Sequence, residues 1–122
     1  EGECVMFKQK LARVVNNIDG AIGCVLMGFD GISIDAYWAE EFPQMQAVAV
    51  ELSNMLDKFR RQQIQDIGDI HEVSITSGDI TTLARVVAED YLLILALSDQ
   101  ADVGRGQTML RLISPFVEKE MR

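Results

Sequence analysis

The sequence is poor in the residues that metal centres and disulfide frameworks require. It has one histidine, two cysteines and two prolines in 122 residues. A lone histidine without clustered cysteines or carboxylates does not supply the ligands of a metal site. Two cysteines, Cys4 and Cys24, are too few for a disulfide framework. We therefore expect no cofactor and a cytoplasmic location.

Long apolar runs and positive charge are also scarce. The longest apolar stretch, YLLILALS at 91–98, is far shorter than the ~20 residues that span a bilayer, so no membrane insertion is expected. The 11 basic residues are outnumbered by 19 acidic ones, giving a net charge of −8. This balance opposes binding to nucleic acid, where affinity depends on neutralising phosphates. With 48% hydrophobic and 25% charged residues, residues 1–122 fit one globular domain.

Hydrophobic periodicity divides the chain into helices and strands. Apolar residues recur at helical spacing in three segments, at 6–19, 43–66 and 103–121. Five segments read as strands, at 21–29, 32–38, 70–77, 80–88 and 91–97. Residues 1–5 are expected to form a flexible tail. Pro115 should kink or break the last helix, because proline lacks the N–H that would bond to residue 111.

The apolar pattern also predicts where the strands lie in the sheet. Segments 21–29 and 91–97 are apolar on both faces, which is typical of central strands covered on both sides. Segments 32–38 and 70–77 alternate apolar and polar residues and are expected to be edges. Between the first two strands, Asp30-Gly31 is a favoured pair for a type I′ hairpin turn. A phosphate-binding loop is not expected there, because a strand follows rather than a helix.

No catalytic constellation is visible. His71 stands alone in an alternating strand, and the serines lack a nucleophile-elbow context. The carboxylates stand in turns or on helix surfaces, without the buried pairing that acid–base catalysis requires. GRG at 104–106 has too few glycines for a phosphate fingerprint and indicates a helix start close to a neighbour. We expect a protein that binds other proteins and is not an enzyme.

Three features together resemble the Roadblock/dynein light-chain family. They are VVNNIDGAIGCVLMGFDGISID at 14–35, the long middle helix, and YLLILALSDQADVGRGQTMLRL at 91–112. The chain is most similar to the bacterial MglB/MglC-like branch, and within it to the short MglC-like members. The resemblance implies a profilin-like α+β fold, α-β-β-α-β-β-β-α. Its five-stranded antiparallel sheet has the order 2-1-5-4-3 and lies between one long helix and the two terminal helices.

The family resemblance also implies a dimer and a class of partner. Family members pair their third strands and pack their long helices antiparallel. The corresponding interface would include His71, Val73 and Ile75 of the third strand and Leu52, Met55 and Phe59 of the long helix, although Leu52 and Phe59 could instead cover the sheet. Bacterial members regulate or scaffold small Ras-like GTPases in cell polarity and motility. The chain ends soon after its last expected helix, which favours an adaptor that binds a Roadblock paralogue or another polarity protein.

The run KFRRQQ at 58–63 is a local concentration of positive charge. Lys58, Arg60 and Arg61 could form a patch for an acidic partner. Alternatively they are the solvated face of a helix, where positive charge near the C-terminus is favoured by the helix dipole. Two other functions remain open on the same fold: a dynein-light-chain-like structural adaptor, and a small-molecule sensor of PAS or longin-like architecture with a pocket between sheet and helix.

Overall fold

The computed structural model describes the backbone of residues 2–62 and 66–121 and, within these ranges, the side chains from Phe7 onward. The elements follow the expected order: α1 (Gly2–Asn16), β1 (Ala21–Gly28), β2 (Ser33–Trp38), α2 (Gln44–Arg61), β3 (Glu72–Thr76), β4 (Ile80–Val87), β5 (Tyr91–Ser98) and α3 (Val103–Glu120). The strands form one sheet in the order β2-β1-β5-β4-β3, with every neighbouring pair antiparallel. The expected fold and strand order are confirmed.

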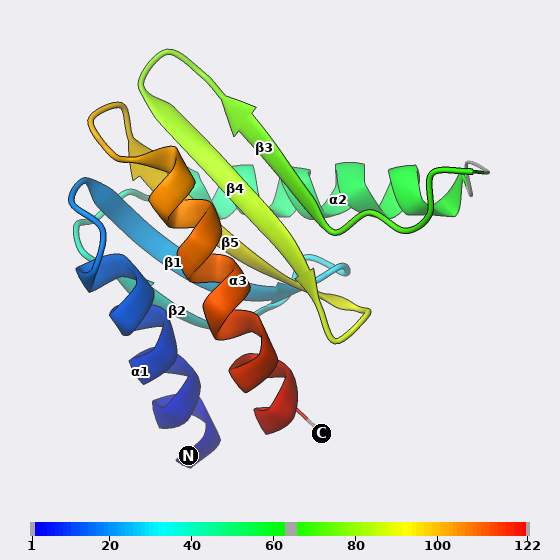
Figure 1. Ribbon diagram of the computed structural model, residues 1–122, viewed down its shortest axis with the longest axis horizontal. Helices are drawn as coiled ribbons and strands as arrows, with labels where there is room; N and C mark the ends of the chain where they lie inside the picture. Colours follow the sequence, from blue (N-terminus) through cyan, green and yellow to red (C-terminus); the bar gives the residue numbers. More distant parts are fainter. Residues whose placement is uncertain (1, 63–65, 122) are drawn as a thin grey trace.

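The sheet is covered on both faces, as Figure 1 shows: α2 crosses one face, and α1 and α3 lie side by side on the other. Each face has its own hydrophobic core. Leu93 and Leu95 of β5 belong to the core under α1 and α3, whereas Leu92 and Ile94 belong to the core under α2. Because successive residues of a strand point to opposite faces, the doubly apolar strands β1 and β5 are central, as predicted.

The β1–β2 hairpin is confirmed, but its turn is not the expected type I′. That turn requires positive φ at both central residues, and here only Gly31 has it, at φ 84°. The Gly31 N–H donates to the Gly28 carbonyl at 3.0 Å, and the Gly28 N–H donates to the Ile32 carbonyl at 3.0 Å. This is a three-residue loop in which a left-handed glycine follows an ordinary turn. The Asp30 carboxylate accepts from the Ile32 N–H at 3.0 Å.

The ends of two helices differ from the sequence-based bounds. α1 begins at Gly2, four residues before the expected start, because no helix breaker stands between Gly2 and Met6. α2 ends at Arg61, and Pro43 caps it instead of being its first residue. The last part of the expected helix at 43–66 includes residues 63–65, which lie outside the described residues. None of the helices, over the residues that the structure describes, is long and apolar enough to cross a membrane.

α3 runs without a break through Pro115, so of the two alternatives predicted there, a kink or a break with restart, the break is wrong. Ser114 does not cap a new helix, and its hydroxyl donates instead to the Leu110 carbonyl at 2.7 Å. A proline ring removes one helical hydrogen bond, but packing of an amphipathic face contributes most of a helix's stability in a protein. Val117, which follows the proline closely, is fully buried, and this contact holds the second half of α3 on the sheet.

The glycines of GRG place α3 close to the sheet. A Cβ atom built on Gly106 would lie 3.0 Å from side-chain carbons of Leu83 and Leu97, so the helix could not approach as closely with a larger residue. Asp102 caps the helix by accepting from the Arg105 N–H at 3.1 Å. The expected helix start against a neighbour is confirmed, and Gly106 has a packing role.

Candidate functional site

The outer face of α2 carries apolar side chains that its own sheet does not cover. Its inward face is buried and includes Leu52 at 2% exposure, so of the two roles predicted for Leu52 the structure favours the one in which it covers the sheet. Met55 and Phe59, by contrast, are 56% and 43% exposed, and Val48 is 40% exposed. The apolar stripe predicted on this helix is therefore wider than the surface that packs on the sheet. One part of it belongs to the core, and the other faces outward.

The free edge of the sheet is β3, and its hydrogen-bonding register identifies the groups that point outward. Ser77 N–H donates to the Ile80 carbonyl and Val86 N–H donates to the His71 carbonyl, each at 2.9 Å. Antiparallel pairs alternate between bonded and non-bonded, so in the β3–β4 register the backbone groups of Val73 and Ile75 face β4. Those of Glu72, Ser74 and Thr76 face the open edge. Of the predicted interface residues, Ile75 is 39% exposed, and His71 is exposed beside the start of β3.

At Ala36, the outward backbone groups of the opposite edge, β2, are occupied by side chains. Ala39 N–H donates to the Ile22 carbonyl at 2.8 Å, and by the same alternation the backbone groups of Ala36 point outward from the sheet. The Ala36 carbonyl accepts from the Lys8 ammonium at 2.7 Å. The Ala36 N–H donates to the Asp35 carboxylate at 2.9 Å. The two edges of the sheet thus differ in the hydrogen-bonding groups that they present.

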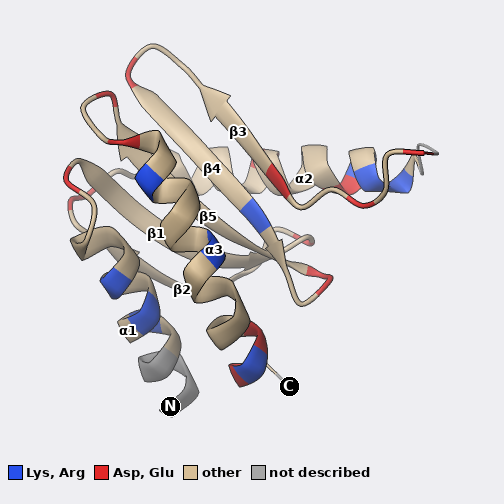
Figure 2. Ribbon diagram, viewed as in Figure 1, with Lys and Arg blue, Asp and Glu red and all other residues tan. Residues whose placement is uncertain are grey.

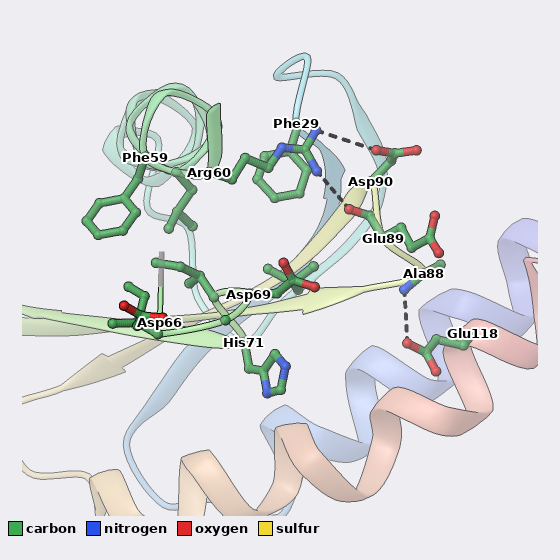
Figure 3. Close-up of a pocket in the computed structure, with 15 residues that line it drawn as sticks. Phe29, Phe59, Arg60, Asp66, Asp69, His71, Ala88, Glu89, Asp90 and Glu118 are labelled. Carbon is green, nitrogen blue, oxygen red and sulfur yellow. Dashed lines mark hydrogen bonds and ion pairs between the residues drawn. The ribbon is translucent and has the colours of Figure 1, made fainter. Parts of the chain in front are cut away.

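A groove of about 790 Å³ lies between the C-terminal end of α2, the segment 66–71 and the β4–β5 turn. Figure 3 shows Phe59 and Arg60 above it and His71 and Glu118 below. Its apolar wall includes Leu56, Phe59, Ile70 and Val86, while its rim carries five carboxylates: Asp66, Asp69, Glu89, Asp90 and Glu118. The predicted interface residues Phe59 and His71 therefore meet at one groove, although they lie on different elements.

Arg60 fastens α2 to the neighbouring turn. Its guanidinium lies 3.7 Å from the centroid of the Phe29 ring. It donates to the Glu89 carbonyl at 2.9 Å and pairs with the Asp90 carboxylate at 3.4 Å. Ala88 and Glu89 have positive φ, 48° and 67°, a conformation that is costly for residues other than glycine. Arg60 thus holds a strained turn in place, a role that neither sequence interpretation of the basic run included.

The other two basic residues of the run differ from Arg60. Arg61 pairs with the Asp57 carboxylate at 2.9 Å and keeps 75% of its side chain exposed. Lys58 is exposed and has no salt bridge among the described side chains. Because Asp57 and Asp90 neutralise the two arginines locally, the run carries much less free positive charge than its sequence indicates.

A second charged cluster ties α3 to the edge strand. The Glu72 carboxylate accepts from Arg111 at 2.9 and 3.1 Å and from Arg85 at 2.7 Å. These hydrogen bonds, foremost that from Arg111, hold the pKa of Glu72 below its usual value, and the pair raises the pKa of Arg111. Sequence reasoning missed this cluster, because its members lie on β3, β4 and α3. It orients β3 from the face opposite to α2.

Replacing Glu72 with glutamine should lower the free energy of unfolding at pH 7 by about 0.5–1 kcal/mol. Because the folded-state pKa of Glu72 lies below its ordinary value of 4.5, the stabilisation is complete above that pH and is lost as the pH falls through the folded-state pKa. Urea unfolding of wild type and Glu72→Gln at pH 7 and about pH 3 measures this difference. Glu51→Gln, on the exposed face of α2, is the control. An equal difference at both pH values would contradict the assignment.

The remaining chemistry-bearing groups are dispersed. Within the described residues, no group of three or more histidine, cysteine, aspartate or glutamate side chains could hold a metal ion. Cys24 is buried in β1, and burial raises the pKa of its thiol to about 12, far above the range in which a thiolate nucleophile forms. The arrangement offers surfaces for binding a protein: an open strand edge, an apolar helix face and an acidic groove between them.

The chain is similar to several solved structures. MglC from Myxococcus xanthus is 32% identical, with 93% of this chain and 98% of that chain covered and a TM-score of 0.77. MglB from Thermus thermophilus, at 14% identity, has a TM-score of 0.87 and covers 98% of this chain and 91% of its own. A Roadblock/LC7 domain from Streptomyces avermitilis, also at 14%, has a TM-score of 0.72 and covers 90% and 96%.

The other two comparisons gave no match: no protein-family model and no curated protein matches the chain at a significant level. The low-identity structures show the shared fold. The similarity to MglC extends over nearly the whole of both chains at 32% identity. With the element order and the sheet order described above, it establishes that the chain belongs to the Roadblock family, in its MglB/MglC-like branch.

Proposed function

We propose that this protein is a dimeric, non-enzymatic interaction module that regulates or scaffolds a small Ras-like GTPase system of the bacterial polarity and motility type. The observation that carries the proposal is the 32% identity to MglC over 93% of the chain. The relative from Thermus thermophilus is described as a gliding protein, which agrees with a role in motility. The protein would act in the cytoplasm, without a cofactor and without binding nucleic acid.

The open edge and the outer face of α2 support dimerisation. Unpaired N–H and C=O groups on an edge strand favour pairing with another strand. A two-fold axis at β3 would place identical strands beside each other. On the α2 face of the sheet, Met55, Phe59 and Ile75 would then be covered by the second copy. One solved MglB is described as having a tetrameric arrangement, which agrees with self-association.

The partner would be a Ras-like GTPase, or a Roadblock paralogue bound to one, docked on the surface that the paired α2 helices form. Lys58 and Arg61 are the basic residues of the run that could meet it, because Arg60 is held by the β4–β5 turn. The sensor alternative requires a cavity between α2 and the sheet. The 790 Å³ groove reaches Leu56 of α2 and Val86 of β4, but most of its lining comes from the end of α2 and from loops. The module interpretation is therefore favoured over the sensor.

Surface plasmon resonance tests the partner. Ras-like GTPases and Roadblock paralogues from the source organism would be passed over the immobilised protein, with GDP or a GTP analogue bound to the GTPases. We expect at least one to bind. Replacing Lys58 and Arg61 with glutamate should slow association about tenfold at low salt and less at high salt. Glu51→Gln is the control. Absence of binding by every candidate would refute the proposed partner class.

A further inference from the structure

Positive charge gathers on the two helices that cover the opposite face of the sheet. From Phe7 to Asn16, α1 has three basic residues and no acidic ones, and α3 has three basic and two acidic residues. Figure 2 shows basic segments on both helices, which lie side by side. On a chain whose net charge is −8, this concentration is unusual. No single stretch of sequence reveals it, because the two helices stand at opposite ends of the chain.

Much of this charge is not neutralised by the side chains that the structure describes. Lys10, Arg13, Arg105 and Lys119 form no salt bridge with any side chain that the structure describes. Arg105 donates to the carbonyl of Asn17 at 2.7 Å, a contact that joins the start of α3 to the end of α1. Lys10 and Arg13 lie three residues apart and share one side of α1, whereas Lys8 of the same helix donates to the Ala36 carbonyl of β2.

Two large apolar side chains stand exposed among these cations. Leu112 is 62% and Phe116 60% exposed. They lie one turn apart on α3 and therefore on the same face. Phe116 belongs to the apolar periodicity of this segment, but the buried face of α3 consists of other residues: Gly106, Leu110, Ile113, Ser114 and Val117. Arg105 lies about two turns before Leu112, and Lys119 lies about one turn after Phe116. Both are on the same side of α3 as this pair.

We infer that these residues form a docking surface, the α1–α3 surface, for an acidic amphipathic segment of a partner protein. It consists of Lys10, Arg13, Arg105, Leu112, Phe116 and Lys119. The apolar pair would anchor the partner's apolar face, as buried aromatic residues do at interfaces. The unpaired cations would orient its carboxylates. From Arg105 to Lys119 the surface is about 21 Å long at 1.5 Å per residue, which accommodates roughly four helical turns.

The position of the surface makes it independent of the proposed dimer. α1 and α3 lie on the face of the sheet opposite to α2 (Figure 1). A partner bound to the α1–α3 surface would leave α2 and the β3 edge free. Such an arrangement suits an adaptor, because two partners can be held at once on opposite faces of one sheet.

Fluorescence anisotropy with a synthetic peptide tests the inference. The probe is an amphipathic peptide of about 18 residues, five helical turns, with leucine on one helical face and glutamate on the other. A scrambled version and a version with lysine in place of glutamate are the controls. We expect the acidic probe to bind about tenfold or more tightly than either control, and more weakly as salt rises. Equal binding of the acidic and basic peptides would overturn the inference.

Variants locate the binding. Leu112→Ser with Phe116→Ser, and separately Lys10→Glu with Lys119→Glu, should each weaken binding of the acidic probe about tenfold or more. Ile32→Ser, 65% exposed at the hairpin, and Lys58→Glu are matched controls that should leave it unchanged. Thermal melts show that each variant is folded. Unchanged binding by the Leu112/Phe116 variant would overturn the inference.

A last arm distinguishes a membrane from a protein partner. Vesicles of phosphatidylcholine with phosphatidylserine would be sedimented with the same variants. If wild type binds the vesicles but not the acidic probe, and the Leu112/Phe116 variant loses the vesicles, the surface is a lipid contact and the inference is overturned.

The anisotropy measurement with the acidic probe is repeated with Ser74→Pro, which targets the proposed dimer alone. Binding of the probe should not change there.

Discussion

Ser74→Pro is expected to convert dimers of this chain to monomers, weakening association about 30- to 150-fold. The Ser74 N–H points to the open edge of the sheet, where a carbonyl of a second β3 strand would accept a hydrogen bond from it. Proline removes that donor, and in a two-fold symmetric dimer the donor is lost from both copies. Two lost hydrogen bonds, together with the clash of the ring, cost about 2–3 kcal/mol. Light scattering across a concentration series measures the shift in mass.

Two further variants separate the edge from the fold. Ser74→Ala keeps the N–H and should remain dimeric, because only the exposed hydroxyl is lost. Ile75→Pro removes an N–H that faces β4, so it should lower the melting temperature as well as the mass. If Ser74→Pro is as dimeric as wild type, or if wild type is monomeric at tens of micromolar, β3 is not the dimer edge.

Arg60→Ala is expected to lower the free energy of unfolding by about 2 kcal/mol. The guanidinium contacts Phe29 at 3.7 Å, the Glu89 carbonyl at 2.9 Å and the Asp57 carboxylate at 3.2 Å. Hydrogen bonds to charged groups and cation–π contacts each contribute of the order of 1 kcal/mol at partly exposed sites. For a domain of this size the melting temperature should fall by roughly 6–10 °C, measured by circular dichroism.

Arg61→Ala is the matched control, because Arg61 lies next in the chain and pairs with the same Asp57. It is 75% exposed and should change stability by less than about 0.5 kcal/mol. Arg60→Lys should fall between the two, since an ammonium cannot stack and donate as the planar guanidinium does. Equal melting temperatures for Arg60→Ala and Arg61→Ala would show that the contacts with the turn contribute nothing measurable.

The sheet order could be predicted from the sequence because the apolar pattern of each strand shows whether one or both of its faces are buried. β1 and β5 are apolar at consecutive positions and proved central, while β2 and β3 alternate and proved to be edges. Turn-forming residues were also informative: the Asp30-Gly31 pair placed the hairpin correctly. Its turn type was wrong, because the loop takes one more residue and Gly31 alone adopts positive φ.

The surface chemistry could be predicted much less well, because it depends on contacts between distant residues. KFRRQQ is the densest positive run in the sequence, yet its arginines are paired with Asp57 and Asp90. Less conspicuous cations of α1 and α3 remain unpaired among the described side chains. Helical spacing likewise indicated an apolar stripe on α2 but did not divide it between core and outward face. That division depends on where the sheet ends.

The closure of β2 at Ala36 sets a limit on how far assembly can proceed. An edge whose outward N–H and C=O are both occupied in the middle of a short strand, here at Ala36 by Asp35 and Lys8, cannot readily receive another strand. A sheet with two open edges can add copies indefinitely and grow into a fibre, whereas one with a single open edge is complete after two. Lys8 and Asp35 would therefore prevent polymerisation. A protein that associates through the unpaired backbone groups of one strand edge then forms an assembly of limited size and not a fibre.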